Sequence, residues 1–138
     1  MTIVLDGKKL SEKSEEDLKR RVSVIKKSTG STPILATILV GDNPASATYV
    51  KMKGNACQRV GMESLKIELP EDTSTDDLIT EIEKLNKNKD VHGILLQHPV
   101  PKHINERKCF DSIDVRKDVD GVTTVSYTHL TLPTIRSV

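Results

Sequence analysis

Aromatic side chains are almost absent from this chain of 138 residues. There is no tryptophan, and two tyrosines and one phenylalanine account for an aromatic content of 2%. Proteins that bind single-stranded nucleic acid stack the bases on aromatic side chains, so this class is disfavoured. The formal net charge of +1 gives no general attraction to nucleic acid or to an anionic membrane surface either. We therefore expect no nucleic-acid partner.

Long apolar runs and closely spaced cysteines are also missing. No segment approaches the roughly 20 apolar residues that span a bilayer, and the first six residues do not resemble a signal peptide. Cys57 and Cys109 lie far apart without C-x-x-C spacing, which favours reduced thiols over a disulfide. No pair of histidines has the spacing of zinc ligands, so we expect no metal. Together these absences indicate a cytoplasmic protein with no membrane contact.

Helix and strand patterns alternate along the chain. The apolar run at 33–40 is typical of a strand buried on both faces, as in a parallel sheet. Periodicity and capping residues predict helices at 8–27, 45–60, 74–89 and 105–113 and strands at 33–40, 64–69 and 91–97. The alternation predicts an α/β domain of three layers, in which helices flank a mostly parallel sheet. Because such sheets bind ligands beyond the carboxyl ends of their strands, Gly41-Asp42 and Gln97-His98 should face one cleft.

The first block with candidate chemistry lies on the helix predicted at 45–60. Ser46, Tyr49 and Lys53 fall on one helical face. A partly desolvated lysine can exchange protons near neutral pH, and a tyrosine ring can stack on a flat ligand. The same spacing is common on amphipathic helices, where Lys53 would be a solvated side chain beside a half-buried tyrosine.

Two further blocks offer an amide and a carboxylate. Gln97 follows a buried strand and precedes a turn with two prolines, so its amide can hold a lysine amine or a ligand carbonyl. The alternative is a glutamine that caps the loop backbone. Asp118 and Asp120 lie in a turn before Gly121, where a carboxylate can accept two N–H bonds from an amino-substituted heterocycle such as a pterin. The alternative is an acidic surface turn.

Taken together, the blocks 40–53, 93–101 and 117–121 resemble the bifunctional methylenetetrahydrofolate dehydrogenase/methenyltetrahydrofolate cyclohydrolase, in its N-terminal catalytic domain. The resemblance covers residues 1–124, which we expect to form a folate-binding catalytic domain. It implies NADP-dependent oxidation of 5,10-methylenetetrahydrofolate and hydrolysis of 5,10-methenyltetrahydrofolate to 10-formyltetrahydrofolate. It also implies a folate as the small-molecule partner and a homodimeric parent enzyme.

The resemblance assigns a role to each candidate residue. Lys53 matches the lysine that handles protons, Gln97 matches the amide that positions it, and Tyr49 matches the ring that stacks on the folate. Asp120 matches the carboxylate that binds the pterin edge. The residues that would also line the folate pocket are Leu96, His98 and Pro99, and His98 stands where many relatives carry leucine.

The last residues, 125–138, depart from the family pattern. No glycine-rich phosphate loop follows Gly121, so no NADP-binding residue is expected in this chain. We interpret the tail as a truncated or chimeric end, with the Rossmann cofactor domain of the family missing. The chain alone should then lack dehydrogenase turnover. The alternatives are a folate-binding module without catalysis and an inert fragment.

Overall fold

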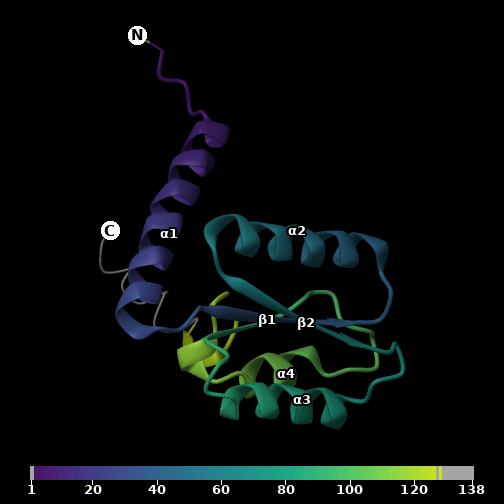
Figure 1. Ribbon diagram of the computed structural model, residues 1–138. Coiled ribbons are helices and arrows are strands. Elements are labelled where there is room, and N and C mark those ends of the chain that lie inside the picture. Colours follow the sequence, from purple (N-terminus) through teal and green to yellow (C-terminus); the bar gives the residue numbers. More distant parts are fainter. Residues whose placement is uncertain (1, 127, 129–138) are drawn as a thin grey trace.

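The chain folds as an alternating series of helices and strands in a computed structural model, which describes residues 2–126 and 128 (Figure 1). Every element predicted above is present, in the predicted order. The structure adds one short 3-10 helix, η1, inside the segment 114–121, which the sequence indicated only as a polar turn. In chain order the elements are α1 (Gly7–Thr29), β1 (Ile34–Val40), α2 (Pro44–Val60), β2 (Glu63–Leu69), α3 (Thr75–Lys87), β3 (Gly93–Leu96), α4 (Glu106–Ser112) and η1 (Val115–Lys117).

The three strands form one parallel sheet in the order β2-β1-β3, so β1 lies in the centre. Helix α2 covers one face of this sheet, and α3 and α4 cover the other (Figure 1). The predicted α/β architecture with three layers is therefore confirmed. The last five residues of β1 are all buried, as the continuous apolar run predicted.

The main core lies between the sheet and the α3–α4 layer. Alternate residues of β1 and β3 enter it from the sheet, and Leu78, Ile82 and Leu85 enter it from α3. Since successive strand residues point to opposite faces, Thr37 and Leu39 lie on the face covered by α2. Thr37 is 1% exposed, and its hydroxyl finds no hydrogen-bond partner among the described residues.

The loops that follow the three strands adjoin one another at the carboxyl edge of the sheet. The Gly41 N–H, just after β1, donates to the Leu69 carbonyl at the end of β2 at 2.9 Å. Gly41 has a φ of 85°, and a Cβ atom there would lie 2.0 Å from a Glu71 carboxylate oxygen and 3.9 Å from Pro101, which follows β3. The loops after β1 and β3 thus lie at the same edge of the sheet, and the expectation that Gly41-Asp42 and Gln97-His98 face one cleft stays a prediction.

A loop after η1 closes the outer side of β3. Asp118 forms a parallel bridge with Ile94, and Val119 packs so closely on Gly93 that a Cβ atom there would lie 2.6 Å from it. The Asp118 carboxylate accepts the backbone N–H groups of Val122 and Thr123 at 3.1 and 3.0 Å. This loop is therefore a fixed part of the sheet edge.

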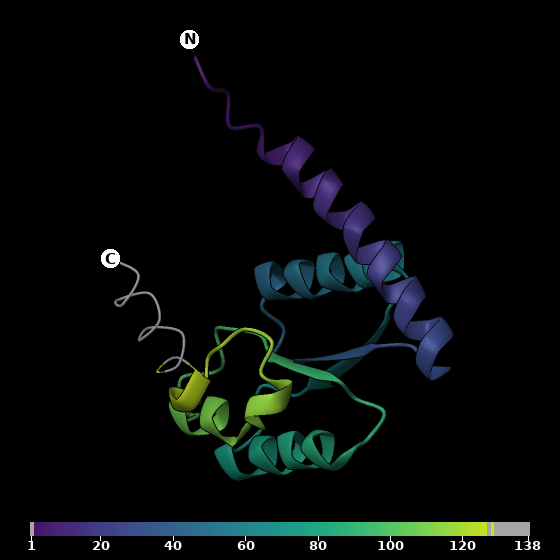
Figure 2. The same cartoon turned by 90° about the vertical axis from the view of Figure 1, so that its left-hand side faces the viewer.

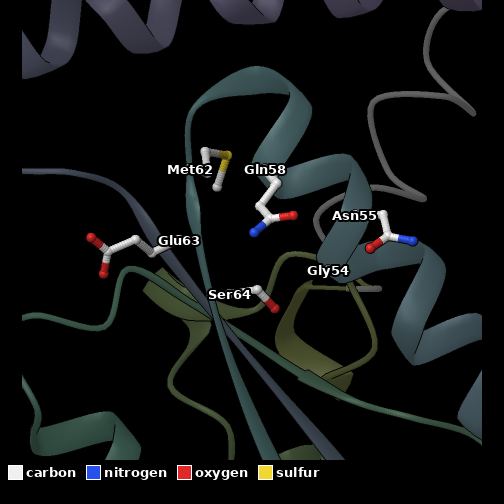
Figure 3. Close-up of a pocket in the computed structure, with 6 residues that line it drawn as sticks. All are labelled: Gly54, Asn55, Gln58, Met62, Glu63 and Ser64. Carbon is white, nitrogen blue, oxygen red and sulfur yellow. The ribbon is translucent and has the colours of Figure 1, made fainter.

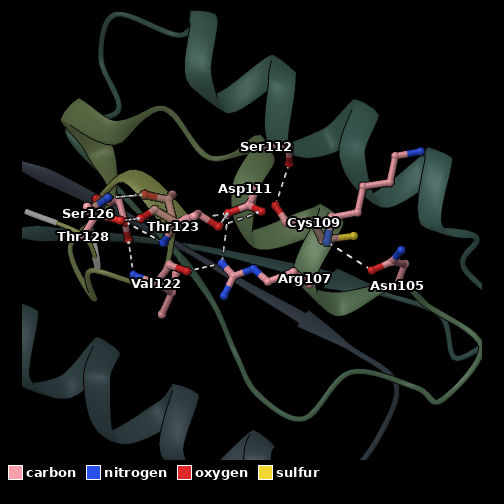
Figure 4. A network of polar contacts seen from close by, with 12 residues as sticks. Asn105, Arg107, Cys109, Asp111, Ser112, Val122, Thr123, Ser126 and Thr128 are labelled. Atoms are coloured by element: carbon pink, nitrogen blue, oxygen red, sulfur yellow. Dashed lines mark hydrogen bonds and ion pairs between the residues drawn. The ribbon is translucent and has the colours of Figure 1, made fainter.

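Helix α4 holds the same loop from the opposite side (Figure 4). Arg107 donates to the Val122 carbonyl and pairs with Asp111 at 3.1 Å. Asp111 in turn accepts the Thr124 backbone N–H at 2.8 Å. The pKa of Asp111 is lowered, chiefly by that backbone hydrogen bond.

Helix α1 projects away from the sheet and touches α2 near its C-terminal end (Figures 1 and 2). Val22 is its buried residue, whereas Leu10 and Ile25 are 66% and 43% exposed. The spacing of apolar residues thus predicted the helix correctly, but most of its apolar face is not packed against any other described residue. None of the described helices is long and apolar enough to cross a bilayer.

Both cysteines are buried and neither forms a disulfide, as predicted. Cys57 lies on α2 and Cys109 on α4, which cover opposite faces of the sheet (Figure 1). Burial raises the pKa of both thiols.

Candidate active site at the carboxyl edge of the sheet

A lysine and a glutamine from distant parts of the chain meet at this edge. The Lys53 ammonium donates a hydrogen bond to the Gln97 amide oxygen, with 2.9 Å between Nζ and Oε1. Lys53 is half-buried, and Gln97 is only 8% exposed. A buried acceptor that holds a lysine amine in place is an arrangement suited to proton transfer.

Helix α2 carries Lys53 to this position. Asn43 caps the start of the helix by accepting the Ser46 backbone N–H at 3.1 Å, and the fixed φ of Pro44 suits the first helical position. Gly61 caps the end in the left-handed conformation, with a φ of 86°. Both ends of α2 are therefore fixed by local sequence, which sets the height of Lys53 above the sheet.

Gln97 is held by the sheet and by its own loop. Its backbone N–H donates to the Ile38 carbonyl at 2.9 Å, so the residue still pairs with β1 just beyond β3. Its side-chain nitrogen donates to the His98 carbonyl at 3.0 Å. Because the nitrogen is engaged there, the amide oxygen is turned toward Lys53.

Tyr49 lies one turn before Lys53 on the same helical face. Ser46 at the start of this face is 2% exposed, whereas Tyr49 is 57% exposed. The ring is thus open to solvent beside the lysine, where a flat ligand could stack on it.

The two aspartates of the 117–121 block differ in their surroundings. The pKa of Asp118 is lowered: burial acts to raise it, but hydrogen bonds from Thr123, Ser126 and Val122 outweigh that effect. Asp120 is exposed, and no hydrogen bond to its carboxylate occurs within the described residues. Asp118 therefore orders the loop, and Asp120 is the carboxylate that faces solvent.

The three predicted pocket-lining residues fall into two groups. Leu96 is 3% exposed and packs in the core, because strand alternation turns it away from the α2 face on which Gln97 lies. The Leu96 side chain therefore lies in the core, and a role for Leu96 in lining the folate pocket stays a prediction. His98 and Pro99 are exposed beyond the end of β3 and are joined by a cis peptide bond.

One residue of this region was missed by reasoning from the sequence. Glu106, the first residue of α4, contacts Nδ1 of His98 with one carboxylate oxygen at 2.7 Å. The same oxygen accepts the Val100 backbone N–H at 3.3 Å. A glutamate at the start of a helix is too common a pattern to have pointed to this contact.

Two hollows lie on the surface between α2 and β2, and the candidate site residues do not line them. One of about 390 Å³ lies between the C-terminal half of α2 and the start of β2 (Figure 3). It is lined by Gly54, Asn55, Gln58, Met62, Glu63 and Ser64. A neighbouring hollow shares Gly54 and Ser64 with it and extends along α2 to Ala47. Neither contains Lys53, Tyr49 or Gln97, so the candidate site lies outside these hollows, on a wall formed by the exposed Tyr49, the half-buried Lys53 and the buried Gln97.

Comparison with known protein families shows to which family the chain belongs. Residues 5–120 match the family described as tetrahydrofolate dehydrogenase/cyclohydrolase, catalytic domain. The chain belongs to this family. The family resemblance read from its three sequence blocks is therefore confirmed.

Similar proteins support the assignment. The bifunctional protein FolD of Teredinibacter turnerae is 62% identical over 130 residues, which cover 94% of this chain and 46% of that protein. The bifunctional protein FolD of Acinetobacter baumannii is 64% identical over 132 residues, which cover 96% of this chain and 47% of that protein. The chain thus spans about half the length of these relatives.

Solved structures show the same relationship. The bifunctional enzyme FolD from Campylobacter jejuni, a methylenetetrahydrofolate dehydrogenase/cyclohydrolase, superposes with a TM-score of 0.89 at 46% identity and covers 92% of this chain and 45% of its own. A Trypanosoma brucei relative, complexed with NADP cofactor and inhibitor, gives a TM-score of 0.88 at 29% identity, covering 94% of this chain and 44% of its own. The fold, as the catalytic domain of this family, is established by these matches. The boundary predicted at residue 124 stays a prediction, since most of residues 125–138 lie outside the described part.

Proposed function

We propose that this chain supplies the folate-binding and proton-transferring wall of a methenyltetrahydrofolate cyclohydrolase site. The observation that carries the proposal is the hydrogen bond of 2.9 Å between Lys53 Nζ and Gln97 Oε1 at the carboxyl edge of the sheet. Parallel sheets bind ligands at this edge, and the family to which the chain belongs acts on tetrahydrofolates.

Lys53 is the proposed proton carrier. Hydrolysis of 5,10-methenyltetrahydrofolate adds water to the methenyl carbon, and that water must lose a proton as the C–O bond forms. Opening of the ring then breaks one C–N bond: the carbinol hydroxyl loses its proton as the C=O bond of the formyl group forms, and the freed nitrogen takes up a proton, so one proton is released to solvent overall. A neutral amine that lies beside the methenyl carbon can accept a proton from the attacking water and return it to the nitrogen. Gln97 holds that amine in place.

Tyr49 and Asp120 are the proposed ligand-binding groups. The exposed Tyr49 ring offers a stacking surface for the pterin, and the solvent-facing Asp120 carboxylate can accept two of its N–H groups. His98 and Pro99, both exposed next to Gln97, would complete the wall. Leu96 would contribute only through its backbone, because its side chain is in the core.

Oxidation of 5,10-methylenetetrahydrofolate belongs to the proposed function of the whole enzyme. The Trypanosoma brucei relative binds NADP in a chain of which this one covers 44%. We assign no NADP-binding residue to the present chain, because the loop that enters α2 lacks the glycine-rich phosphate-binding pattern. We therefore expect the chain alone to catalyse no NADP-dependent oxidation, and a homodimeric parent is part of the same proposal.

The decisive experiment measures hydrolysis of 5,10-methenyltetrahydrofolate through the loss of its absorbance. The purified chain is compared with Lys53→Met, and the matched control is Lys51→Met, an exposed lysine on the same helix. We expect hydrolysis above the spontaneous rate for the wild type and Lys51→Met, and only the spontaneous rate for Lys53→Met. Equal rates for all three proteins would refute catalysis by this chain.

A binding measurement separates the remaining alternatives. Thermal unfolding is followed with and without 5,10-methenyltetrahydrofolate for the same proteins, since a ligand that binds only the folded state raises the midpoint. A raised midpoint without hydrolysis would identify a folate-binding module. No shift and no hydrolysis would identify an inert fragment.

A further inference from the structure

The start of α4 is connected to the candidate site through a short series of hydrogen bonds. One Glu106 carboxylate oxygen contacts the His98 ring at 2.7 Å and the Val100 backbone N–H at 3.3 Å. The Glu106 side chain is 29% exposed, so these contacts are partly shielded from water. Glu106 therefore fastens both sides of Pro99 to α4.

The fastened loop supplies the group that orients Gln97. The Gln97 side-chain nitrogen donates to the His98 carbonyl at 3.0 Å, and its oxygen accepts from Lys53 at 2.9 Å. An amide has two ends of similar size but opposite hydrogen-bonding character. If the His98 carbonyl moved away, the amide could rotate and present its nitrogen to the Lys53 ammonium, where two donors would face each other.

A simpler account treats the contact of Glu106 with His98 as an isolated surface interaction. Even a charged surface pair contributes little, typically about 0–1 kcal/mol. The two contacts of Glu106 nevertheless converge on the segment that holds Gln97, which a solitary surface pair does not do. The two accounts differ in what happens to Gln97 when Glu106 is removed.

We propose that Glu106 is a positioning residue for the Lys53–Gln97 pair. By holding His98 and Val100, it fixes the His98 carbonyl, and that carbonyl keeps the Gln97 oxygen directed at Lys53. This inference rests on the proposed function for its effect on catalysis, but its structural part can be tested without any substrate.

Gln97 offers a direct spectroscopic readout in the full chain. The sequence contains only two glutamines, Gln58 and Gln97, so labelling glutamine side chains with ¹⁵N gives two amide signals. Gln58 is exposed on α2 and serves as an internal reference. In Glu106→Ala we expect hydrogen exchange of the Gln97 side-chain amide to accelerate by about tenfold or more, with Gln58 unchanged.

Matched variants separate positioning from general destabilisation. Glu81→Ala removes a glutamate of similar exposure, whose side chain is 32% exposed and pairs with Lys84 at 2.7 Å. It should leave Gln97 exchange unchanged. Glu106→Gln keeps an oxygen that can accept from Val100 and should restore most of the protection. Where Glu106→Ala does not fold, His98→Ala removes the ring contact alone and should still accelerate Gln97 exchange.

The activity measurement follows from the same variants. Lys53-dependent hydrolysis should fall by about tenfold in Glu106→Ala, which corresponds to about 1.4 kcal/mol. Glu106→Gln should regain most of the lost rate. If the wild type and Lys53→Met hydrolyse 5,10-methenyltetrahydrofolate at the same rate, the proposed function is wrong. The exchange experiment still tests the positioning role of Glu106 in that case. Unchanged Gln97 exchange in both Glu106→Ala and His98→Ala would overturn the positioning role.

Discussion

Lys53 and Gln97 are 44 residues apart in sequence, and their side chains are joined by a hydrogen bond of 2.9 Å. One comes from the middle of α2 and the other from the residue after β3. Because α2 and β3 both pack against β1, the central strand sets the distance between them. The pair is therefore a property of the assembled sheet and does not exist in any single element.

Removal of the Gln97 side chain tests the value of this hydrogen bond. In Gln97→Ala the Lys53 ammonium loses its acceptor, so we expect hydrolysis of 5,10-methenyltetrahydrofolate to fall by about tenfold or more. Gln58→Ala, on the exposed flank of α2, is the control and should behave as the wild type. Loss of absorbance of the substrate gives both rates, and an unchanged rate in Gln97→Ala would show that the lysine needs no partner.

Asp118 should be a stabilising residue rather than a ligand-binding one. Its carboxylate holds the Val122 and Thr123 amides, and hydrogen bonds to a charged acceptor are stronger than neutral ones. We expect Asp118→Asn to lower the free energy of unfolding by about 2 kcal/mol at neutral pH. Urea unfolding measures this, with the exposed Asp72→Asn as control. Equal stability of the two variants would contradict the assignment.

Acid should destabilise the domain through the same loop. The pKa values of Asp111 and Asp118 are lowered in the folded state, and that of Asp114 is lowered to about 2 by its hydrogen bonds with Arg116. A lowered carboxyl pKa stabilises the fold above the unfolded value of about 3.9, and this contribution is lost as the pH falls through the folded value. Urea unfolding between about pH 5 and pH 2 should show falling stability. Asp118→Asn should flatten that slope.

Gly41 should disfavour any side chain. Its φ of 85° is strained for other residues, whereas the Glu71 carboxylate that a Cβ atom would meet ends an exposed, flexible side chain and can move aside. We expect Gly41→Ala to cost about 1–2 kcal/mol in the free energy of unfolding. Gly7→Ala is the control, since Gly7 begins α1 without a left-handed φ, and a Cβ atom there would have no neighbour within 4 Å. Similar unfolding curves for both variants would count against strain at Gly41.

Two buried threonines should respond in opposite ways to replacement by valine. The Thr37 hydroxyl has no partner among the described residues, so Thr37→Val should stabilise the domain by about 1 kcal/mol. The Thr123 hydroxyl donates to Ser126 at 2.8 Å and accepts the Ser126 backbone N–H at 3.0 Å. Thr123→Val should therefore destabilise. Thermal unfolding of both variants checks the contrast, and a destabilised Thr37→Val would point to a buried water on that hydroxyl.

The sequence was sufficient for the helices and strands of the layers and for the contact at the centre of the candidate site. The apolar run of β1 and the caps of α2 are local signals, and parallel strands bring their loops to one edge whatever the loops contain. The resemblance then predicted a Lys53–Gln97 contact, and the two side chains do meet.

Features that depend on three-dimensional detail could not be predicted. Asp118 accepts the backbone N–H groups of the turn, whereas the Asp120 carboxylate faces solvent. The sequence places both residues in the same turn and does not specify which of them makes these hydrogen bonds. The inward side chain of Leu96 was missed because pocket lining was transferred by position, without regard to strand alternation. The contact of Glu106 with His98 joins α4 to a surface loop whose path has no periodic signal in the sequence.

The loop bridge between Asp118 and Ile94 also bears on how the domain behaves in a crowded solution. Unpaired strand edges are templates for association with other chains. At β3 the edge is occupied by this bridge, and Val119 fills the space over Gly93. At the opposite edge, β2 carries Glu63 and an ion pair of 2.6 Å between Lys66 and Glu68. Charged side chains on an edge strand disfavour pairing with a further strand, so both edges of the sheet oppose the growth of intermolecular β-structure.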